Sequence, residues 1–149
     1  MTKEKLIKSK KRVKEHGEVF TPMWMVRKMV DLVDSDAKKP SKTFLEPACG
    51  DGRFLCEILE RRLAVAKSGQ ESLLAVSTLY GIELLPDNVE SAKNNLLFTF
   101  LKFSESKDIE THLKAAEIID RNIVCGNALT KTDHNGELIK FTEWNLEEH

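Results

Sequence analysis

The sequence is poor in cysteine and contains no long apolar run. Its three cysteines, Cys49, Cys56 and Cys125, form no Cys-x-x-Cys pair and no cluster with histidine. We therefore expect reduced thiols and no bound metal. No apolar stretch approaches the roughly 18 residues of a membrane helix, and the Lys-rich start lacks the apolar segment of a signal peptide. We expect no membrane partner and a cytoplasmic location.

The chain also lacks a strong net charge of either sign. It holds 23 Lys+Arg against 24 Asp+Glu over 149 residues, one domain's worth of chain. The positive charges gather at the start, where residues 1–42 hold twelve Lys/Arg against six Asp/Glu. We expect a basic N-terminal arm at residues 1–16 and a single domain at residues 17–149. The arm has two interpretations, a solvated or frayed helix and a segment that contacts DNA phosphates.

Two common nucleotide-binding motifs are missing from the glycine-rich turn of the chain. The stretch Leu45–Leu55, LEPACGDGRFL, predicts the end of a buried strand, a tight turn with two glycines, and a helix that runs to about Lys67. The turn lacks the third glycine of G-x-G-x-x-G and the Gly-Lys-Ser/Thr of a phosphate-binding loop. It does carry the acids Glu46 and Asp51, which suit a ligand with hydroxyls and a positive charge better than one with phosphates.

The rest of the chain alternates predicted helices and strands. Gly69 is expected to end the helix after the turn, and Leu73–Val76 to begin a second strand or a short lead-in. The second strand proper is Thr78–Leu84, and Glu83 lies at its carboxyl end, next to the turn if the two strands are neighbours. The remaining predicted elements are helices at Pro86–Phe103 and Asp108–Asp120, a third strand at Asn122–Cys125, and a last short strand or hairpin at Leu138–Trp144.

These residues resemble a known family. The string E-P-A-C-G-D-G-R-F-L and a later strand that ends in Gly-Ile-Glu-Leu look like motifs I and II of adenine-specific DNA methyltransferases of restriction-modification systems. The resemblance runs from about Gly17 to Leu129. It implies an α/β fold with a doubly wound, Rossmann-like methyltransferase sheet, truncated to about three parallel strands with flanking helices. It also implies that the chain is the cofactor-binding part of such an enzyme, with S-adenosylmethionine as cofactor.

The resemblance assigns roles to individual residues. Phe20-Thr21-Pro22 resembles motif X, whose loop closes over the methionine end of the cofactor. The residue types themselves predict Thr21 as the N-cap and Pro22 as the first residue of the next helix. For Glu83 we favour bonds to both ribose hydroxyls over a surface glutamate at a strand end. Asn127 stands where an acid commonly receives the adenine amino group, and its side-chain carbonyl can still accept that bond. The predicted cofactor-binding residues are Phe20, Thr21, Pro22, Glu46, Pro47, Ala48, Cys49, Gly50, Glu83, Leu84, Asn127 and Ala128.

The family's catalytic motif, Asn/Asp-Pro-Pro-Tyr/Phe, is missing. That motif holds the amine of a flipped adenine for attack on the sulfonium methyl, and the four prolines of this sequence lie in no such string. We therefore assign no catalytic residue, expect no methyl transfer by this chain alone, and expect DNA to be the substrate of a full-length parent. The alternative is a non-catalytic module that binds nucleic acid or a partner subunit, with a vestigial cofactor turn.

A prediction about association follows from the topology that the resemblance implies. Sheets of the family have the strand order 3-2-1-4, and the fourth strand lies beyond the end of this sequence. Without it the edge of strand one lacks its partner, and an unpaired apolar edge invites pairing with another chain. We expect either a homodimer through that edge or coverage of the edge by Leu138–Trp144.

Overall fold

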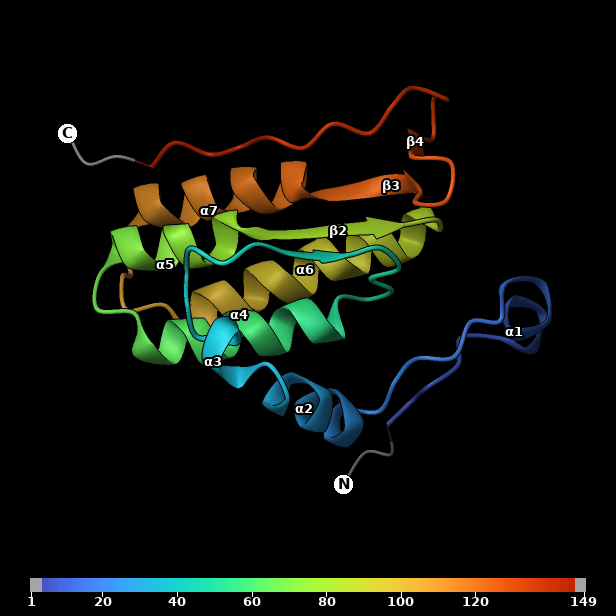
Figure 1. The fold of residues 1–149 in the computed structure, drawn as a ribbon, viewed down its shortest axis with the longest axis horizontal. Helices are drawn as coiled ribbons and strands as arrows, with labels where there is room; N and C mark the ends of the chain where they lie inside the picture. Colours follow the sequence, from blue (N-terminus) through green and yellow to red (C-terminus); the bar gives the residue numbers. More distant parts are fainter. Residues whose placement is uncertain (1–3, 147–149) are drawn as a thin grey trace.

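The chain forms one mostly parallel β-sheet with helices packed against it (Figure 1). The computed structural model describes residues 4–146, so the first three residues of the predicted arm lie outside the described part. None of the helices in this part is long and apolar enough to span a bilayer. In chain order the elements are α1 (Lys10–His16), α2 (Met23–Asp31), α3 (Asp34–Ala37), β1 (Phe44–Glu46), α4 (Arg53–Val65), α5 (Gly69–Ser77), β2 (Leu79–Glu83), α6 (Pro86–Phe103), α7 (Ile109–Asn122), β3 (Ile123–Asn127) and β4 (Thr132–Asp133).

The sheet has the strand order β1-β2-β3-β4. β1, β2 and β3 run parallel, with Leu45 opposite Tyr80 and Ile82 opposite Val124. Parallel neighbours need a crossover connection, which α4 and α5 supply between β1 and β2 and α6 and α7 between β2 and β3. The predicted α/β class with a parallel sheet is therefore confirmed. The short β4 adds an antiparallel strand beside β3.

The helices and the C-terminal segment contact opposite faces of the sheet. Because side chains alternate along a strand, Leu79 and Ile123 point to one face, where they join the helices in the apolar core. Tyr80 points to the other face. Its ring centroid lies 5.0 Å from that of Phe141, and its hydroxyl donates to the main-chain oxygen of Thr142 at 2.7 Å. The segment after β4 therefore covers part of the face to which Tyr80 points.

The predicted last strand at Leu138–Trp144 is only partly seen. Its single strand-like pairing within the described residues is one bridge to Thr132. Trp144 donates its ring N–H to Asn122 Oδ1 at 2.8 Å, so the segment runs back past α7 (Figure 1). The expected coverage of the β1 edge by this segment is wrong, since the return through β4 takes the chain to the opposite edge. Leu45 in β1 stays 51% exposed.

One predicted helix end is in fact a helix start. Ser68 is the N-cap of α5 and accepts from the Glu71 N–H at 3.1 Å, while the Glu71 carboxylate accepts from the Lys67 N–H at 2.6 Å. Such reciprocal capping satisfies main-chain donors that a helix start otherwise leaves free, and it outweighs the helix-ending tendency of Gly69. The predicted strand lead-in at Leu73–Val76 is therefore wrong, because these residues form the middle of α5.

A fully buried arginine joins α4 to the segments around it. Arg62 is 0% exposed. It donates to the main-chain oxygens of Ala37, Lys42 and Ala75 at 2.8, 2.5 and 2.9 Å, and to the Thr78 hydroxyl at 2.6 Å. Burial lowers the pKa of Arg62 to about 10, so the group stays charged at neutral pH. One side chain thus ties together the end of α3, the entry to β1 and the end of α5.

Candidate functional site

The carboxyl ends of β1, β2 and β3 open onto a pocket of about 740 Å³. All of the predicted cofactor-binding residues line this pocket except Pro22. The fold therefore brings the predicted residues together from four separate stretches of the chain. Lining residues that it missed are His16, Gly17, Glu18, Val19, Asp51, Arg53, Phe54, Leu85, Gly126 and Leu129.

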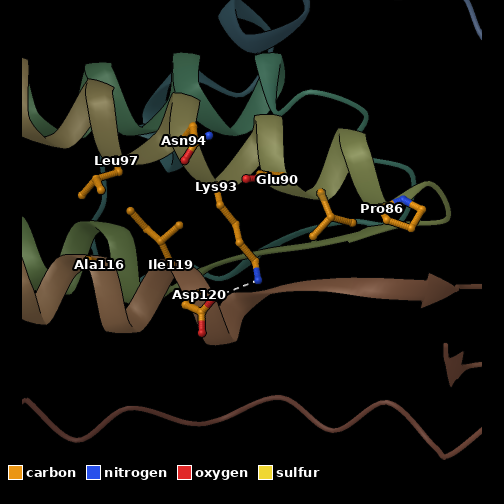
Figure 2. A pocket seen from close by; sticks show the side chains of 9 residues that line it. Pro86, Glu90, Lys93, Asn94, Leu97, Ala116, Ile119 and Asp120 are labelled. Carbon is orange, nitrogen blue, oxygen red and sulfur yellow. Dashed lines mark hydrogen bonds and ion pairs between the residues drawn. The ribbon is translucent and has the colours of Figure 1, made fainter. Parts of the chain in front are cut away.

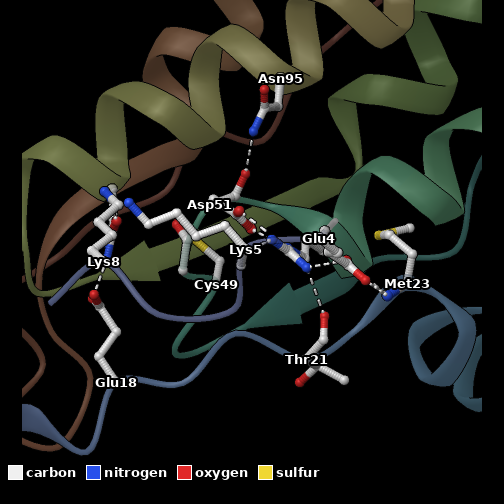
Figure 3. A network of polar contacts seen from close by, with 12 residues as sticks. Glu4, Lys5, Lys8, Glu18, Thr21, Met23, Cys49, Asp51 and Asn95 are labelled. Atoms are coloured by element: carbon white, nitrogen blue, oxygen red, sulfur yellow. Dashed lines mark hydrogen bonds and ion pairs between the residues drawn. The ribbon is translucent and has the colours of Figure 1, made fainter. Parts of the chain in front are cut away.

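The helix after Pro22 begins differently from the prediction. Pro22 itself is the residue before α2, and Thr21 does not cap it. The first N–H of the helix, that of Met23, instead donates to the Glu4 carboxylate at 3.1 Å (Figure 3). A carboxylate there is favourable, because a helix N-terminus carries partial positive charge. The predicted Thr21 cap is thus wrong, since an acid from the arm occupies its place.

The glycine turn has the backbone conformation that its two glycines predict. Gly50 and Gly52 have φ angles of 55° and 88°, which side chains other than glycine rarely adopt. The Cys49 N–H donates to the Ile82 oxygen at 2.9 Å, which fixes the turn to β2. A Cβ at position 52 would lie 3.3 Å from Ala92 Cα, so the glycine also lets α6 come close to the start of α4.

β2 accommodates the turn because position 81 has no side chain. A Cβ on Gly81 would lie 2.9 Å from Cys49 Sγ and 3.1 Å from Ile123 Cδ1. Glycine weakens a strand interior, so its presence there often marks a close approach of another segment. The neighbouring segment here is the pocket turn itself.

Glu83 is held in place at the end of β2. It is 9% exposed. Its Oε1 accepts from the Gly50 N–H at 3.2 Å, and its Oε2 accepts from the Leu85 N–H at 2.9 Å and from Asn88 Nδ2 at 3.3 Å. A carboxylate has about four acceptor sites, so this fixed group retains capacity for a hydroxyl donor in the pocket.

Glu46 lies on the same face of the sheet as Glu83. It pairs in register with Gly81, two residues before Glu83 on the neighbouring strand, and both acids line the pocket. Burial raises the pKa of Glu46, and a weak bond from the Ala48 N–H at 3.4 Å counteracts this only in part. An amine or other cation in the pocket would favour the ionised form of this acid.

Asn127, at the end of β3, already uses its side-chain oxygen within its own loop. Oδ1 accepts from the N–H groups of Leu129 and Thr130, at 2.9 and 3.4 Å. This Asx-type turn shapes the wall formed by Ala128. The expected bond from an adenine amino group would therefore have to share this oxygen.

Aromatic and basic side chains close the pocket on the side of the arm. Phe20 lies against the turn, where a Cβ on Gly50 would be 3.4 Å from its ring. The Arg53 guanidinium lies 5.3 Å from the Phe20 ring centroid, and its Nη1 donates to the main-chain oxygen of Thr21 at 3.1 Å. Cation–π contact and hydrogen bond together hold this wall in position.

Two basic side chains of the predicted arm contact acidic side chains of the domain. Lys8 and Arg12 contact Asp87, which is in the first turn of α6. Arg12 also pairs with Glu18 at 2.8 Å. The interpretation of the arm as a DNA-contacting segment stays a prediction, but these two cations already have acidic partners.

A second hollow, of about 450 Å³, lies between α6 and α7 (Figure 2). Lys93 reaches from α6 to Asp120 of α7, with 2.9 Å between Nζ and Oδ1. None of the predicted cofactor-binding residues lines this hollow. The two acids and the glycine turn therefore mark the first pocket as the candidate site.

The cysteines are suited to packing more than to chemistry. Burial raises the pKa of Cys49 and of Cys56 to about 12, and it raises that of Cys125 as well. The thiols are therefore protonated, and poorly nucleophilic, at neutral pH. Within residues 4–146, no group of three or more His, Cys, Asp or Glu side chains is arranged to hold a metal ion.

Comparison with known proteins decides the family. A family model described as N-6 DNA Methylase matches residues 4–137, which is most of the chain. The chain belongs to the N-6 DNA methylase family. It is therefore related to enzymes that methylate DNA, as motifs I and II indicated. No curated protein and no solved structure matches the chain.

Among the polar residues that sequence reasoning missed in this N-6 DNA methylase family member, Asn88 and Arg53 hold parts of the candidate site in place. Asn88 is completely buried in the first turn of α6 and donates to Glu83. In the sequence, Asn88 is indicated only as a polar residue beside the apolar stripe of that helix. Arg53 follows the glycine turn directly and pairs with Asp51 of that turn at 3.1 Å. Its contacts with the main-chain oxygens of Lys5 and Thr21 span more than 30 residues, so no local pattern indicated them.

Proposed function

We propose that this chain binds S-adenosylmethionine as the cofactor-binding part of an N6-adenine DNA methyltransferase of the restriction-modification type. The observation that carries the proposal is the position of Glu46 and Glu83. They lie on one face of the sheet, on neighbouring strands, and both line a single pocket beside the glycine turn.

The pocket suits this cofactor in size and in chemistry. Its volume of about 740 Å³ falls in the range of about 300–1,000 Å³ that is usual for small-molecule sites. In the proposed arrangement the remaining acceptor site of Glu83 takes a ribose hydroxyl, and a bond to the second hydroxyl shares an oxygen with a donor of the protein. Glu46 with the segment Phe20–Thr21 surrounds the methionine end. Leu84 and Ala128 flank the adenine ring.

Each proposed contact has a physical basis in this chain. The bonds from Gly50, Leu85 and Asn88 orient the Glu83 carboxylate before a ligand arrives, which reduces the entropy cost of binding. Glu46 offers negative charge in a partly buried position, where attraction to a cation is stronger than in water. The bound cofactor would supply an electrophilic methyl group on its sulfonium.

We further propose that this chain by itself does not transfer the methyl group. None of its four prolines belongs to an Asn/Asp-Pro-Pro-Tyr/Phe string, so it has no device of that kind for a flipped adenine. DNA would then be the substrate of a longer parent protein.

Association through the edge of β1 remains part of the proposal. β1 pairs with β2 on one side, and the sheet described for residues 4–146 has no strand on its other side. A second copy could add a strand there by main-chain pairing. Light scattering on a size-exclusion column tests this: we expect a dimer that Leu45→Lys dissociates, and a monomeric wild type contradicts it.

Calorimetric titration with S-adenosylmethionine tests the function. We expect Glu83→Ala to weaken binding about 10- to 100-fold, since bonds to a charged group contribute about 1.5–3 kcal/mol. The matched control is Glu90→Ala, an exposed acid on α6, which should bind like wild type. No heat from wild type at millimolar ligand contradicts the proposal. Salt-dependent DNA retention without cofactor binding would favour the nucleic-acid-binding alternative.

A further inference from the structure

Asn88 connects Glu83 with the N-terminal arm. Its side chain is 0% exposed. Its Nδ2 donates to Glu83 Oε2 at 3.3 Å and to Glu18 Oε2 at 2.6 Å, and its Oδ1 accepts from Lys8 Nζ at 2.5 Å. Both amide hydrogens and the amide oxygen are therefore engaged. Two of these three contacts are with residues 4–22, which comprise the described part of the arm and the segment that follows it.

The arm is attached a second time beside Asn88. Lys8 Nζ and Arg12 Nη1 contact the same oxygen of Asp87, at 2.7 and 2.5 Å. Arg12, followed by Lys8, lowers the pKa of Asp87, and Asp87 with Glu18 raises that of Arg12, so Asp87 and Arg12 are both charged at neutral pH. Because the Asp87 side chain is 51% exposed, dissolved salt can weaken this attachment.

The two ends of the segment 4–22 meet at the rim of the pocket. The Phe20 N–H donates to the Leu6 oxygen at 2.6 Å, which closes this segment into a loop. Glu4 pairs with Arg53 at the start of α4 (Figure 3). Residues 4–22 therefore lie against both the glycine turn and the start of α6.

We propose that residues 4–22 form a clasp over the pocket, and that Asn88 is a positioning residue that links closure of the clasp to the orientation of Glu83. Opening of the clasp removes Lys8 and Glu18 from Asn88, so its amide can turn away from Glu83. A ligand that holds Glu83 keeps Asn88 in place and favours the closed clasp. For S-adenosylmethionine this rests on the proposed function, whereas the link between clasp and carboxylate needs no ligand.

Such a link has a measurable size. When two events, here closure of the clasp and orientation of Glu83, favour the same arrangement, each changes the equilibrium constant of the other by the same factor, commonly about 5- to 150-fold. Asp87→Asn opens the clasp without changing any group that contacts Glu83. Asn88→Ala removes the link itself. The matched control is Asn94→Ala, an exposed asparagine on the same helix.

The first experiment uses the 149-residue chain without ligand. Trypsin cleavage within residues 4–14 reports opening of the clasp, and hydrogen exchange of the Gly50 and Leu85 amides reports release of Glu83, their acceptor. We expect Asp87→Asn and Asn88→Ala to accelerate both processes about tenfold, and the control to change neither. Far-UV circular dichroism verifies that each variant is folded.

Titration with S-adenosylmethionine completes the test. We expect Asp87→Asn to weaken binding about tenfold although all three donors to Glu83 remain. If Asp87→Asn speeds cleavage of the arm but leaves exchange at Gly50 and Leu85 unchanged, the clasp and Glu83 are independent and the proposal is wrong. Unchanged arm cleavage in Asn88→Ala also overturns it. Absence of binding by wild type would overturn the proposed function instead. The cleavage and exchange measurements without ligand would still show whether the clasp and Glu83 are coupled.

Discussion

Replacing Arg62 by methionine tests how a buried charge that has no acidic partner among residues 4–146 stabilises this fold. The guanidinium donates to the main-chain oxygens of Ala37, Lys42 and Ala75, which belong to three separate segments. Methionine keeps much of the apolar stem but has no donor. The variant therefore leaves these three oxygens in the interior without their side-chain partner.

The expected loss follows from these contacts. An unsatisfied buried acceptor costs about 1–3 kcal/mol, so three carbonyls cost at least about 3 kcal/mol. The removed charge no longer has to be buried, which offsets part of this cost. We expect Arg62→Met to lower the free energy of unfolding by about 2–4 kcal/mol, a large share of the ~5–15 kcal/mol of a typical domain. Arg62→Lys should lose a similar amount, because one ammonium cannot reach acceptors that a planar guanidinium spans.

Urea unfolding followed by circular dichroism at pH 7 measures this loss. The matched control is Arg27→Met, because the Arg27 side chain is 61% exposed and lies 3.8 Å from its partner Glu57. Exposed ion pairs contribute little, so this variant should change the free energy of unfolding by less than about 1 kcal/mol. A loss for Arg62→Met no larger than that of the control would show that water or relaxation satisfies the carbonyls, and would refute the reasoning.

Three further predictions concern the pocket and the cysteines. Asn127→Asp should tighten S-adenosylmethionine binding about fivefold, since one oxygen can keep the turn while the other accepts from the adenine amine; weaker binding in calorimetry contradicts the adenine placement. Glu46→Gln should weaken cofactor binding yet raise the urea midpoint at pH 7. Burial raises the pKa of Glu46, so the folded state binds the proton more tightly and the wild type loses stability relative to the variant as pH rises through that window; a midpoint difference that does not change with pH argues against this. Cys125 should react with a thiol reagent at pH 8 faster than Cys49 and Cys56, whose pKa burial raises to about 12; equal rates would contradict their burial.

Features with a local physical cause could be predicted from the sequence. The helix Pro86–Phe103 has the predicted bounds, because proline suits a first helical position and one apolar stripe continues to its end. The pocket residues could be predicted because parallel strands end at one edge of a sheet. Glu46, Glu83 and Asn127 each stand at the end of a strand, and the structure brings them to the same pocket.

Contacts between distant segments could not be predicted in this way. Glu4 caps a helix 19 residues further along the chain, and nothing near Met23 indicates this. Asn88 contacts Glu18 across 70 residues, so only the folded chain shows that it serves both the arm and the pocket. Ser68 is a different case, because its capping pattern with Glu71 was visible in the sequence but the neighbouring glycine suggested the opposite.

Because Gly81 has no side chain, a substitution in the middle of the buried strand β2 would change the candidate site indirectly. A methyl group inserted there would act as a wedge against Cys49 Sγ, 2.9 Å away, and would push the neighbouring Gly50 N–H out of reach of Glu83. Ligand affinity would then change although every residue that touches the ligand is the same. A substitution at Gly81 would therefore change the candidate site from a position that does not line the pocket.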